Sequence, residues 1–491
     1  MEQKSVKKNF LMNTLLTMSA FIFPLITYPY VSPILSPSGM GSVSFATSIA
    51  TYFTMFAQLG IPTYGIRACA LARDDKKALT KTVQELLIIN IVMMILSYIV
   101  FFILLFTVPQ MKDEKTLFIV VGSMVWLNCI GMNWMYQGLE EYTFITVWSV
   151  VCKTISVVAM LLLVHAKSDY IIYGGLSIFA SYGSSLANFF YAHKFIDLKP
   201  VGHYHFRKHL RHVGIFFAMS CATTIYTNLD IVMLGFMKTN VDVGYYQMAV
   251  KIKNILVSLV TSLGTVMLPR ASYYIGQGDM KRFRAIAQDA LHFVWLVAVP
   301  LAVYTVLFAS QGIYFISSAE FTGSILPMQI VMPTLIFIGL TNIIGMQILV
   351  PTGNEMYVLY SEIAGAAVDF VINLLLIPHL ASAGAAIGTL AAEAVVLGVQ
   401  YHYTKPMIRK LLKRIPYGKL LTANAAAAIL SVFCRHLELV SSLRWNSFLI
   451  LAISCILFFV VYLAVLLLLK EPLVLTFQKQ VHQWLMRRKE A

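Results

Sequence analysis

Charged residues are scarce in this chain. Asp, Glu, Lys and Arg make up 12% of its 491 residues, about half of the roughly 25% found in an average soluble domain. Apolar and aromatic residues make up 59%, and they recur in runs of about 20 residues, the length that crosses a hydrocarbon core of about 30 Å. This composition excludes an ordinary soluble globular protein. It predicts an all-α integral membrane protein with no soluble domain between its spans.

Several motifs are also absent. The sequence has no GxxxxGKS/T pattern, which excludes ATP hydrolysis by a P-loop. No CxxC pair occurs, so neither a disulfide framework nor a zinc site is expected. The loops between the apolar runs that would face outward are short, whereas membrane glycosyltransferases need larger outer loops with acidic motifs. We therefore expect neither an enzyme nor a cofactor. The six scattered cysteines are Cys69, Cys129, Cys152, Cys221, Cys434 and Cys455.

The apolar runs predict fourteen transmembrane helices. The first, Phe10 to Val31, lacks a small-residue cleavage site, so we expect it to remain as a span. Those at 42–65 and 245–268 are rich in Ser, Thr, Gln and Lys, which is typical of helices that face a water-filled interior. The predicted helices cover residues 10–32, 42–65, 83–107, 116–138, 143–165, 170–192, 213–235, 245–268, 287–310, 323–350, 357–380, 383–401, 417–437 and 446–470.

Lys and Arg lie mainly on one side of these helices. If the N-terminus is cytoplasmic, 28 of the 37 lie in cytoplasmic segments and 6 in the opposite loops. Because basic loops remain in the cytoplasm, we expect a multi-pass plasma-membrane protein with both termini cytoplasmic. The net charge of +15 therefore reflects these loops, and no nucleic-acid partner is expected.

An internal repeat relates the two halves of the chain. The sequence GSVSFA begins at Gly41 and Arg67 follows 26 residues after Gly41, while GYYQMA begins at Gly244 and Arg270 follows 26 residues after Gly244. The offset between the copies is 203 residues in both cases. Each repeat holds an even number of helices, so the two copies share one orientation and are related by an axis along the membrane normal.

The repeat predicts a chain of three parts. These are a six-helix bundle with a cytoplasmic linker at 1–212, a second six-helix bundle at 213–416, and two extra transmembrane helices with a basic cytoplasmic tail at 417–491. Two bundles related in this way are typical of transporters that work by alternating access. Nothing in the sequence resembles the repeated filter loop of a channel. Without a P-loop, transport must run downhill or on an ion gradient.

Several stretches resemble the Wzx-type oligosaccharide flippases of the MOP superfamily, which also holds the MATE drug exporters and the lipid II flippases. In the first half these are KNFLMN from Lys8, FPLITYPY from Phe23, GMGSVSF from Gly39 and QLGIPTYGIR from Gln58. In the second half they are YTNLDIVMLG from Tyr226, VGYY from Val243 and MLPR from Met267. The resemblance spans nearly the whole chain, and its motifs are loose and mostly structural.

The resemblance implies a protein that moves an undecaprenyl-pyrophosphate-linked oligosaccharide from the inner to the outer leaflet of a bacterial plasma membrane. The glycan is then a capsule or exopolysaccharide repeat unit or a teichoic-acid precursor, because flippases for both resemble this chain. The lipid II branch carries arginines in its first helix. Residues 10–32 contain no Lys or Arg, which argues against lipid II as the substrate.

Cationic residues inside the predicted helices are candidates for binding the pyrophosphate, because phosphate pairs with Lys and Arg and a low local dielectric strengthens the interaction. Lys251 and Lys253 lie near the middle of the helix at 245–268, where a lysine costs about 2.5–3.5 kcal/mol on insertion scales. Pairing with Asp230 on the neighbouring helix, purely for folding, is the alternative.

Lys153, in the middle of the helix at 143–165, is a third candidate for the pyrophosphate. The repeat-related helix carries Asp369, with Glu362 and Asn373 on the same face. Lys153 and Asp369 either form an ion pair across the axis, or a carboxylate couples transport to H+ or Na+. The candidate carboxylates are Asp369, Asp230 and Glu362.

Arg67 and Arg270 end the helices at 42–65 and 245–268 on the cytoplasmic side. Their equivalence in the repeat favours a cytoplasmic gate or a first contact with the pyrophosphate. The alternative is that both side chains extend to lipid headgroups, as long basic side chains commonly do.

Other polar and aromatic side chains are candidates for contacts with the glycan. Amides hydrogen-bond sugar hydroxyls or, alternatively, join helices to one another. Tyrosines form an aromatic cage for a quaternary ammonium group or, more commonly, an interfacial belt. The candidates are Asn128, Asn133, Asn342, Gln347, Tyr226, Tyr245 and Tyr246.

Three histidines, His205, His209 and His212, fall on one helical face. A metal ion can bind to such a face, but a basic interfacial helix on anionic lipid is the more common case. We therefore expect these histidines to lie at the lipid interface and expect no metal site.

A MATE-like antiporter of organic cations is the alternative function. A carrier of cations needs negative charge in its cleft. The three lysines and three carboxylates named above leave the predicted cleft near neutral, which favours the flippase over the antiporter.

Overall fold

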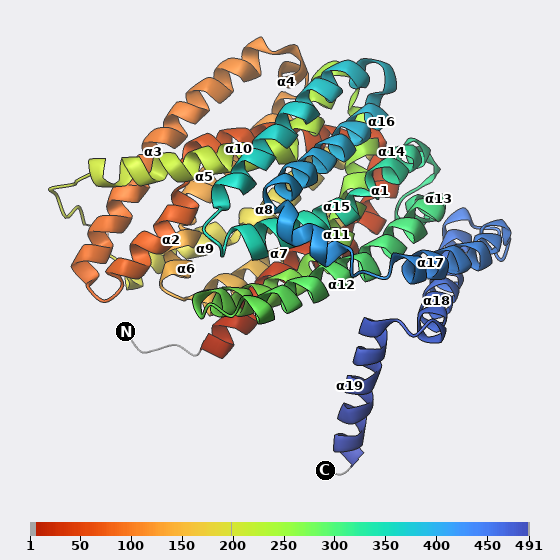
Figure 1. Cartoon of the computed structure of the whole chain (residues 1–491). Coiled ribbons are helices and arrows are strands. Elements are labelled where there is room, and N and C mark those ends of the chain that lie inside the picture. Colours follow the sequence, from red (N-terminus) through yellow and green to blue (C-terminus); the bar gives the residue numbers. More distant parts are fainter. Residues whose placement is uncertain (1–5, 198, 490–491) are drawn as a thin grey trace. The chain divides into compact units, whose positions relative to one another are not determined.

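The computed structural model describes residues 6–197 and 199–489, without the side chains of residues 6, 7, 10, 263–270, 272, 480–482 and 484–489. In this part of the chain all regular elements are helices (Figure 1). They form two compact units, Met1–Gly244 and Tyr245–Ala491. The all-α membrane fold expected from the sequence is confirmed, whereas the boundaries at 212 and 416 stay a prediction.

The first unit begins with a helix of 53 residues and ends just after α10. The break after α1 falls at Gly60, whose φ of 72° lies in the left-handed region. Asp75 caps α3, because its Oδ1 accepts hydrogen bonds from the backbone N–H groups of Lys77 and Ala78. The helices are α1 (Val6–Gln58), α2 (Ile61–Ala72), α3 (Lys76–Thr107), α4 (Pro109–Asp113), α5 (Lys115–Ile130), α6 (Asn133–Gly138), α7 (Tyr142–Leu163), η1 (Lys167–Asp169), α8 (Tyr170–Tyr182), α9 (Ser184–Tyr191), η2 (Ala192–Lys194) and α10 (Arg207–Met237).

The second unit contains most of α11 and all later elements. Helices α17 and α18 pack on α12. The Tyr304 hydroxyl of α12 donates a hydrogen bond to the Leu451 carbonyl of α18, and the Tyr462 hydroxyl of α18 donates one to the Leu296 carbonyl of α12, at 2.9 Å each. The elements are α11 (Asn240–Gly276), α12 (Met280–Leu307), α13 (Ala309–Ile316), η3 (Ala319–Ser324), α14 (Ile325–Val331), α15 (Thr334–Thr341), the π-helix η4 (Asn342–Leu349), α16 (Glu355–Leu412), α17 (Tyr417–Val432), η5 (Phe433–His436), α18 (Leu443–Leu468) and α19 (Pro472–Lys489).

Nine helical stretches among the described residues are long and apolar enough to cross a membrane, or ten if one bent pair is counted as a span. The count does not confirm fourteen spans, and the reason lies in a few elements. Two of the nine stretches, Leu11–Ala72 and helix α16, each cover two predicted spans. The backbone breaks at Ser36 (φ 62°) in the first and at Ala381 (φ 47°) in the second. The predicted spans at 170–192 and 245–268 fall on α8–α9 and α11, which are outside the nine. Fourteen spans therefore stay a prediction.

Helix α16 is folded back on itself at Ala381. The rings of Tyr357 and Tyr403 stack with their centroids 3.8 Å apart, and Gln400 Nε2 donates a hydrogen bond of 3.1 Å to Ser361 Oγ. In both pairs the two residues lie at nearly equal sequence distances from the break, to within two residues. The two arms of α16 therefore run antiparallel and side by side.

Small residues allow the two arms to approach each other closely. A Cβ on Gly384 would lie 2.7 Å from the carbonyl carbon and oxygen of Leu376, which are backbone atoms of the other arm. Because lipid tails are as apolar as leucine, membrane helices gain little from hydrophobic burial, and close packing through small residues holds them together.

Gly384→Ala is expected to lower the stability of the chain, and Gly398→Ala is expected to raise it slightly or leave it unchanged. The added methyl at 384 would meet the Leu376 backbone, and overpacking of this kind costs about 1–3 kcal/mol. A Cβ added at Gly398, in the same helix, would meet no neighbouring group within 4 Å. Only the gain in helix propensity of roughly 0.5–1 kcal/mol then applies. Thermal unfolding in detergent micelles measures the difference. Equal midpoints for the two variants would contradict the close contact of the arms.

Candidate functional site

Two polar side chains lie between the arms of α16. Asp369 is 1% exposed and Asn373 is fully buried. A Cβ on Gly388 of the opposite arm would lie 2.2 Å from Asn373 Oδ1 and 2.9 Å from Asp369 Oδ1. The carboxylate and amide oxygens therefore converge on one place, and glycine at 388 leaves the room that they need.

Helix α11 contacts α16 next to Gly388. The hydroxyls of Tyr246 and Thr389 share a hydrogen bond of 2.7 Å, and Tyr246 is 2% exposed. Thr389 directly follows Gly388, so four oxygen-bearing side chains from α11 and both arms of α16 gather in one buried region. We call this set (Tyr246, Asp369, Asn373 and Thr389) the polar core of the second unit. Oxygen ligands are what hard cations prefer, and a buried carboxylate can also take up a proton.

The two lysines of α11 follow Tyr246 within two turns. Lys253 is buried, with 9% of its surface exposed, and Lys251 is half-buried. Residues two positions apart in a helix do not share a face, so the two ammonium groups leave α11 in different directions. Neither lysine extends fully into solvent.

The cationic candidates of the first unit have different surroundings. Lys153 Nζ donates a hydrogen bond of 2.6 Å to Ser19 Oγ, which joins α7 to the first arm of α1. Arg67 is exposed on α2. Arg270 lies in α11, but its side chain is outside the described residues. Asp230 is buried in α10 and Glu362 is half-buried in α16.

Two of the glycan-contact candidates are joined to neighbouring helices. Asn128 Oδ1 accepts a hydrogen bond of 2.6 Å from Gln58, and Asn133 Oδ1 accepts one of 2.8 Å from Asn188. These contacts favour the alternative that both amides hold helices together.

The other glycan-contact candidates lie on several elements. Gln347 is buried in the π-helix η4 and Asn342 is half-buried at its start. The Tyr245 ring packs against Gly323 of η3, and Tyr226 is half-buried in α10.

An ionic cluster of the first unit was not expected from the sequence. Glu85 of α3 is fully buried, and its Oε2 lies 2.7 Å from His209 Nε2 and 3.1 Å from Lys208 Nζ. The His209 ring bonds through Nδ1 to the Tyr64 hydroxyl at 2.8 Å, and the His205 backbone N–H donates to Glu85 Oε1 at 2.7 Å. We call Tyr64, Glu85, Lys208 and His209 the α3–α10 clasp, because they tie α10 to α2 and α3.

The expectation that His209 faces the lipid interface is therefore wrong. Its side chain is 2% exposed, because the carboxylate of Glu85 and the hydroxyl of Tyr64 satisfy its two ring nitrogens. Within the described residues no group of His, Cys, Asp and Glu is arranged to hold a metal ion. The signal that could have revealed the clasp is Glu85 itself, a carboxylate at the start of an apolar run that needs a buried partner.

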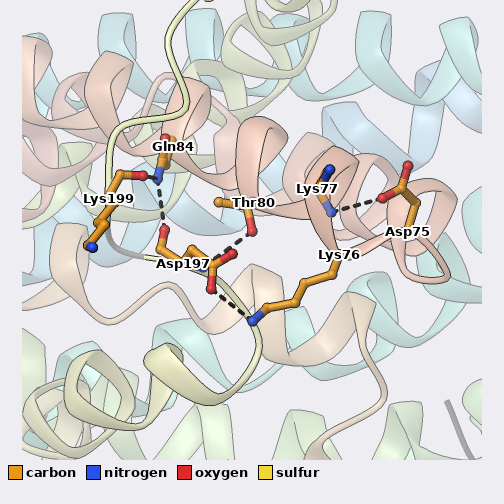
Figure 2. A network of polar contacts seen from close by, with 7 residues as sticks. All are labelled: Asp75, Lys76, Lys77, Thr80, Gln84, Asp197 and Lys199. Carbon is orange, nitrogen blue, oxygen red and sulfur yellow. Dashed lines mark hydrogen bonds and ion pairs between the residues drawn. The ribbon is translucent and has the colours of Figure 1, made fainter.

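The linker before α10 lies along the first turns of α3 (Figure 2). Lys76 Nζ is 2.8 Å from Asp197 Oδ1, and Gln84 Nε2 donates to the carbonyls of Asp197 and Lys199 at 2.8 and 2.9 Å. Thr80 Oγ1 accepts a hydrogen bond from the Asp197 backbone N–H at 3.3 Å. These contacts fix the place where α10 begins and bring His209 to Glu85.

Glu85→Ala is expected to lower the unfolding temperature well below that of the parent chain, whereas Asp197→Ala is expected to change it little. Glu85 makes buried hydrogen bonds to charged and polar groups, which are worth roughly 1.5–3 kcal/mol each. Asp197 and Lys76 are 59% and 57% exposed, and exposed pairs contribute about 0.2–1 kcal/mol. Thermal unfolding of both variants in the same detergent is the measurement. The same decrease in unfolding temperature in both variants would show that the clasp contributes no more to stability than a surface ion pair.

Two family models match this sequence. The model described as "Polysaccharide biosynthesis protein" matches residues 6–274, more than half of the chain. The MatE model matches residues 216–375. The two matches overlap across α10 and α11.

Individual proteins match over most of the chain. A protein of Escherichia coli (strain K12) assigned to O-antigen transport is 22% identical over 404 residues, which are 82% of this chain and 97% of that protein. A solved structure of the lipid II flippase MurJ in an inward closed conformation superimposes with a TM-score of 0.70 at 15% identity, covering 95% of this chain and 100% of that one. An inward-facing multidrug resistance MATE transporter gives a TM-score of 0.61 at 13% identity, covering 83% and 99%. These structures establish the likeness of the fold.

Proposed function

Because the chain belongs to the family of polysaccharide biosynthesis proteins, we propose that it is a flippase for an undecaprenyl-pyrophosphate-linked oligosaccharide. It moves this substrate from the inner to the outer leaflet of a bacterial plasma membrane by alternating access. Support comes from the relative assigned to O-antigen transport and from the fold shared with a lipid II flippase. The distribution of Lys and Arg supports cytoplasmic termini.

The shielded lysines of α11 are the observation that carries the proposal. Lys251 and Lys253 are half-buried and buried, and an ionisable side chain within a predicted span is by default a candidate for function. A pyrophosphate supplies several negative oxygens that accept hydrogen bonds from ammonium groups. Lys153, Arg67 and Arg270 complete the proposed set of cationic residues along the path of the headgroup.

The glycan is proposed to be a capsule or exopolysaccharide repeat unit or a teichoic-acid precursor. The relative assigned to O-antigen transport supports a repeat unit built on a lipid carrier. The absence of Lys and Arg from residues 10–32 argues against lipid II. Asn342, Gln347, Tyr226, Tyr245 and Tyr246 remain proposed contacts for its sugars.

Coupling to an ion gradient is assigned to the polar core of the second unit. Asp369 and Asn373 direct oxygen atoms to one place beside Gly388, and the Tyr246–Thr389 pair lies next to it. A carboxylate in such a place can bind Na+ or H+, and its charge then depends on the ion. Asp230 and Glu362 are the alternative coupling carboxylates.

Flipping of a fluorescent undecaprenyl-pyrophosphate oligosaccharide in proteoliposomes tests the function. Lys251→Ala/Lys253→Ala is expected to slow flipping by roughly tenfold or more, since hydrogen bonds between charged groups are worth about 1.5–3 kcal/mol each. Lys410→Ala/Lys413→Ala removes the same charge from exposed positions of the same unit and is expected to flip at the parent rate. Because Lys251 and Lys253 leave α11 in different directions, the single variants identify which one carries the contact.

A cationic dye supplied to the same proteoliposomes tests the MATE-like alternative. The MatE match over residues 216–375 is the observation that favours it. Movement of the dye without movement of the lipid-linked glycan would overturn the flippase and make the lysines structural.

Asp369→Asn is expected to abolish the acceleration of flipping by a Na+ or H+ gradient, while flipping without a gradient continues. The amide preserves the size of the side chain but carries no charge for the ion to neutralise. Glu355→Gln, an exposed position at the start of α16, is the control and should respond to gradients as the parent does. A full gradient response in Asp369→Asn would move the coupling role to Asp230 or Glu362.

A further inference from the structure

Buried polar side chains continue from the polar core along the second arm of α16. Thr389, Glu393, Gln400 and Thr404 share one face of this arm, because they are separated by four, seven and four residues. Each of them is 9% exposed or less. The first arm adds Ser361, which is fully buried and faces the second arm as Asp369 does. We call the four residues outside the polar core (Ser361, Glu393, Gln400 and Thr404) the polar row.

A row of this kind is unusual in a membrane helix. Helix α16 is one of the stretches long and apolar enough to cross a membrane, and polar residues inside such a stretch are rare unless they serve a function. Holding the two arms together is the simpler role. The Ser361 and Thr404 hydroxyls, however, donate to carbonyls of their own arm, at 2.6 and 2.7 Å. These bonds do not join the arms and leave both oxygens able to accept.

Gln400 has an acceptor that its neighbours leave unused. Its Nε2 donates to Ser361 Oγ at 3.1 Å, and its Oε1 has no hydrogen-bond partner among the described residues. The side chain is only 3% exposed. A buried polar atom without a partner is costly, so Oε1 requires a bound ion or water molecule.

The π-helix η4 packs against the same amide. A Cβ on Gly345 would lie 3.2 Å from Gln400 Nε2 and 3.4 Å from its Oε1. Glycine at 345 therefore lets the backbone of η4 approach the amide closely. π-Helices are rare and frequently occur at functional sites, so the surroundings of Gln400 are specialised on both sides.

The polar row reaches the surface at the end of the α16 hairpin that carries Thr404. Tyr403, the residue before it, is 44% exposed and stacks on Tyr357. Lys405 and Arg409 are exposed just beyond. This end belongs to the basic segment 402–419, which is cytoplasmic in the proposed orientation.

Towards the tip of the hairpin the two arms close on each other. Asn373 and Ile377 are fully buried, and a Cβ on Gly384 would lie 2.7 Å from the Leu376 backbone. The arms touch there through backbone atoms, so the line of polar side chains ends at the polar core. It is open at one end and closed at the other.

We propose that the polar row is the path by which the coupling cation moves between the polar core and the cytoplasmic side, with Gln400 and Ser361 as its intermediate binding site. This inference rests on the proposed function, because it takes coupling at Asp369 as given. Amide and hydroxyl oxygens replace part of the water around a cation. They carry no net charge, so they bind the cation weakly enough to release it, as conduction requires.

Glu393 and Gly365 complete the path between Gln400 and the polar core. Glu393 lies one turn from Thr389 and supplies negative charge to a cation that has lost its water. The one apolar position, Val396, interrupts the row. Since Ser361 lies opposite Gln400 and the arms are antiparallel, the residue opposite Val396 is Gly365, which has no side chain to fill the space.

Cysteine accessibility tests the path without any substrate. In a chain whose six native cysteines are replaced by serine, Gln400→Cys is compared with Ile377→Cys in inverted membrane vesicles. Both positions are shielded, at 3% and 0% exposure, but only position 400 lies on the row. A cationic, membrane-impermeant methanethiosulfonate is expected to react at 400 about tenfold faster or more, since reaction at 377 requires local unfolding. Equal rates, or faster reaction at 400 from the outer face, would overturn the proposal.

The rate of gradient-driven flipping gives a second measurement. Gln400→Leu keeps the size of the side chain and removes its amide. It is expected to slow gradient-driven flipping roughly tenfold, while the cation concentration for half-maximal acceleration stays at the parent value because the polar core is intact. Gln478→Leu, at an exposed position of α19, should behave as the parent. An unchanged rate in Gln400→Leu, or a changed half-maximal concentration, would overturn the path.

Two gradients identify the cation and separate this inference from the proposed function. A Na+ gradient at equal pH and a pH gradient without Na+ are applied in turn, and Gln400→Leu is expected to slow the response to whichever one accelerates the parent. A parent that flips the glycan but responds to neither gradient would overturn the path and leave the flippase. A parent that does not flip would overturn the proposed function, and labelling at position 400 would still decide whether the row is accessible.

Discussion

Backbone-to-backbone contact between helices, made possible by glycine, is the constraint on which this structure depends. Lipid provides no hydrophobic drive for helices to associate, so their stability in the membrane rests on close packing and on hydrogen bonds that close packing allows. Gly384 and Gly388 bring the arms of α16 together, and Gly41 and Gly244 bring α1 to α11. Asp369 and Asn373 are placed by a contact of this kind, and Glu85 and His209 are brought together by the folding of the linker before α10.

The polar core of the second unit follows from the α16 contact. Asp369 and Asn373 lie in a seam that Gly388 keeps open, and Thr389 follows that glycine and meets Tyr246. A larger residue at 388 would remove the space in which their oxygen atoms converge. Packing and the proposed ion binding at this place therefore depend on the same small side chain, which is why substitutions there are poor tests of either alone.

The sequence predicted the helices well where hydrophobicity decides them and poorly where long-range contacts do. The span expected at 143–165 is α7, Tyr142–Leu163, because its apolar run has clear ends. The loop expected between 32 and 42 is instead helical on both sides of Ser36, despite Pro33 and Pro37. The partner of Glu85, His209, is 124 residues away, a distance that no local pattern reports. Likewise, Gly41 is visible in the repeat, but its role requires knowing that the Asn240 carbonyl lies against it.

Helix α10 is held at both of its ends by interactions of opposite character. At its start, Glu85 binds Lys208 and His209 in a buried ionic cluster. Near its other end, Gly235 receives the Phe45 ring, and the following turn meets Gly41 through backbone alone. Opening the first end exposes a carboxylate that must be rehydrated, whereas opening the second separates neutral groups. The start of α10 is therefore its more strongly fixed end, because hydrogen bonds to charged groups contribute more to stability than contacts between neutral groups.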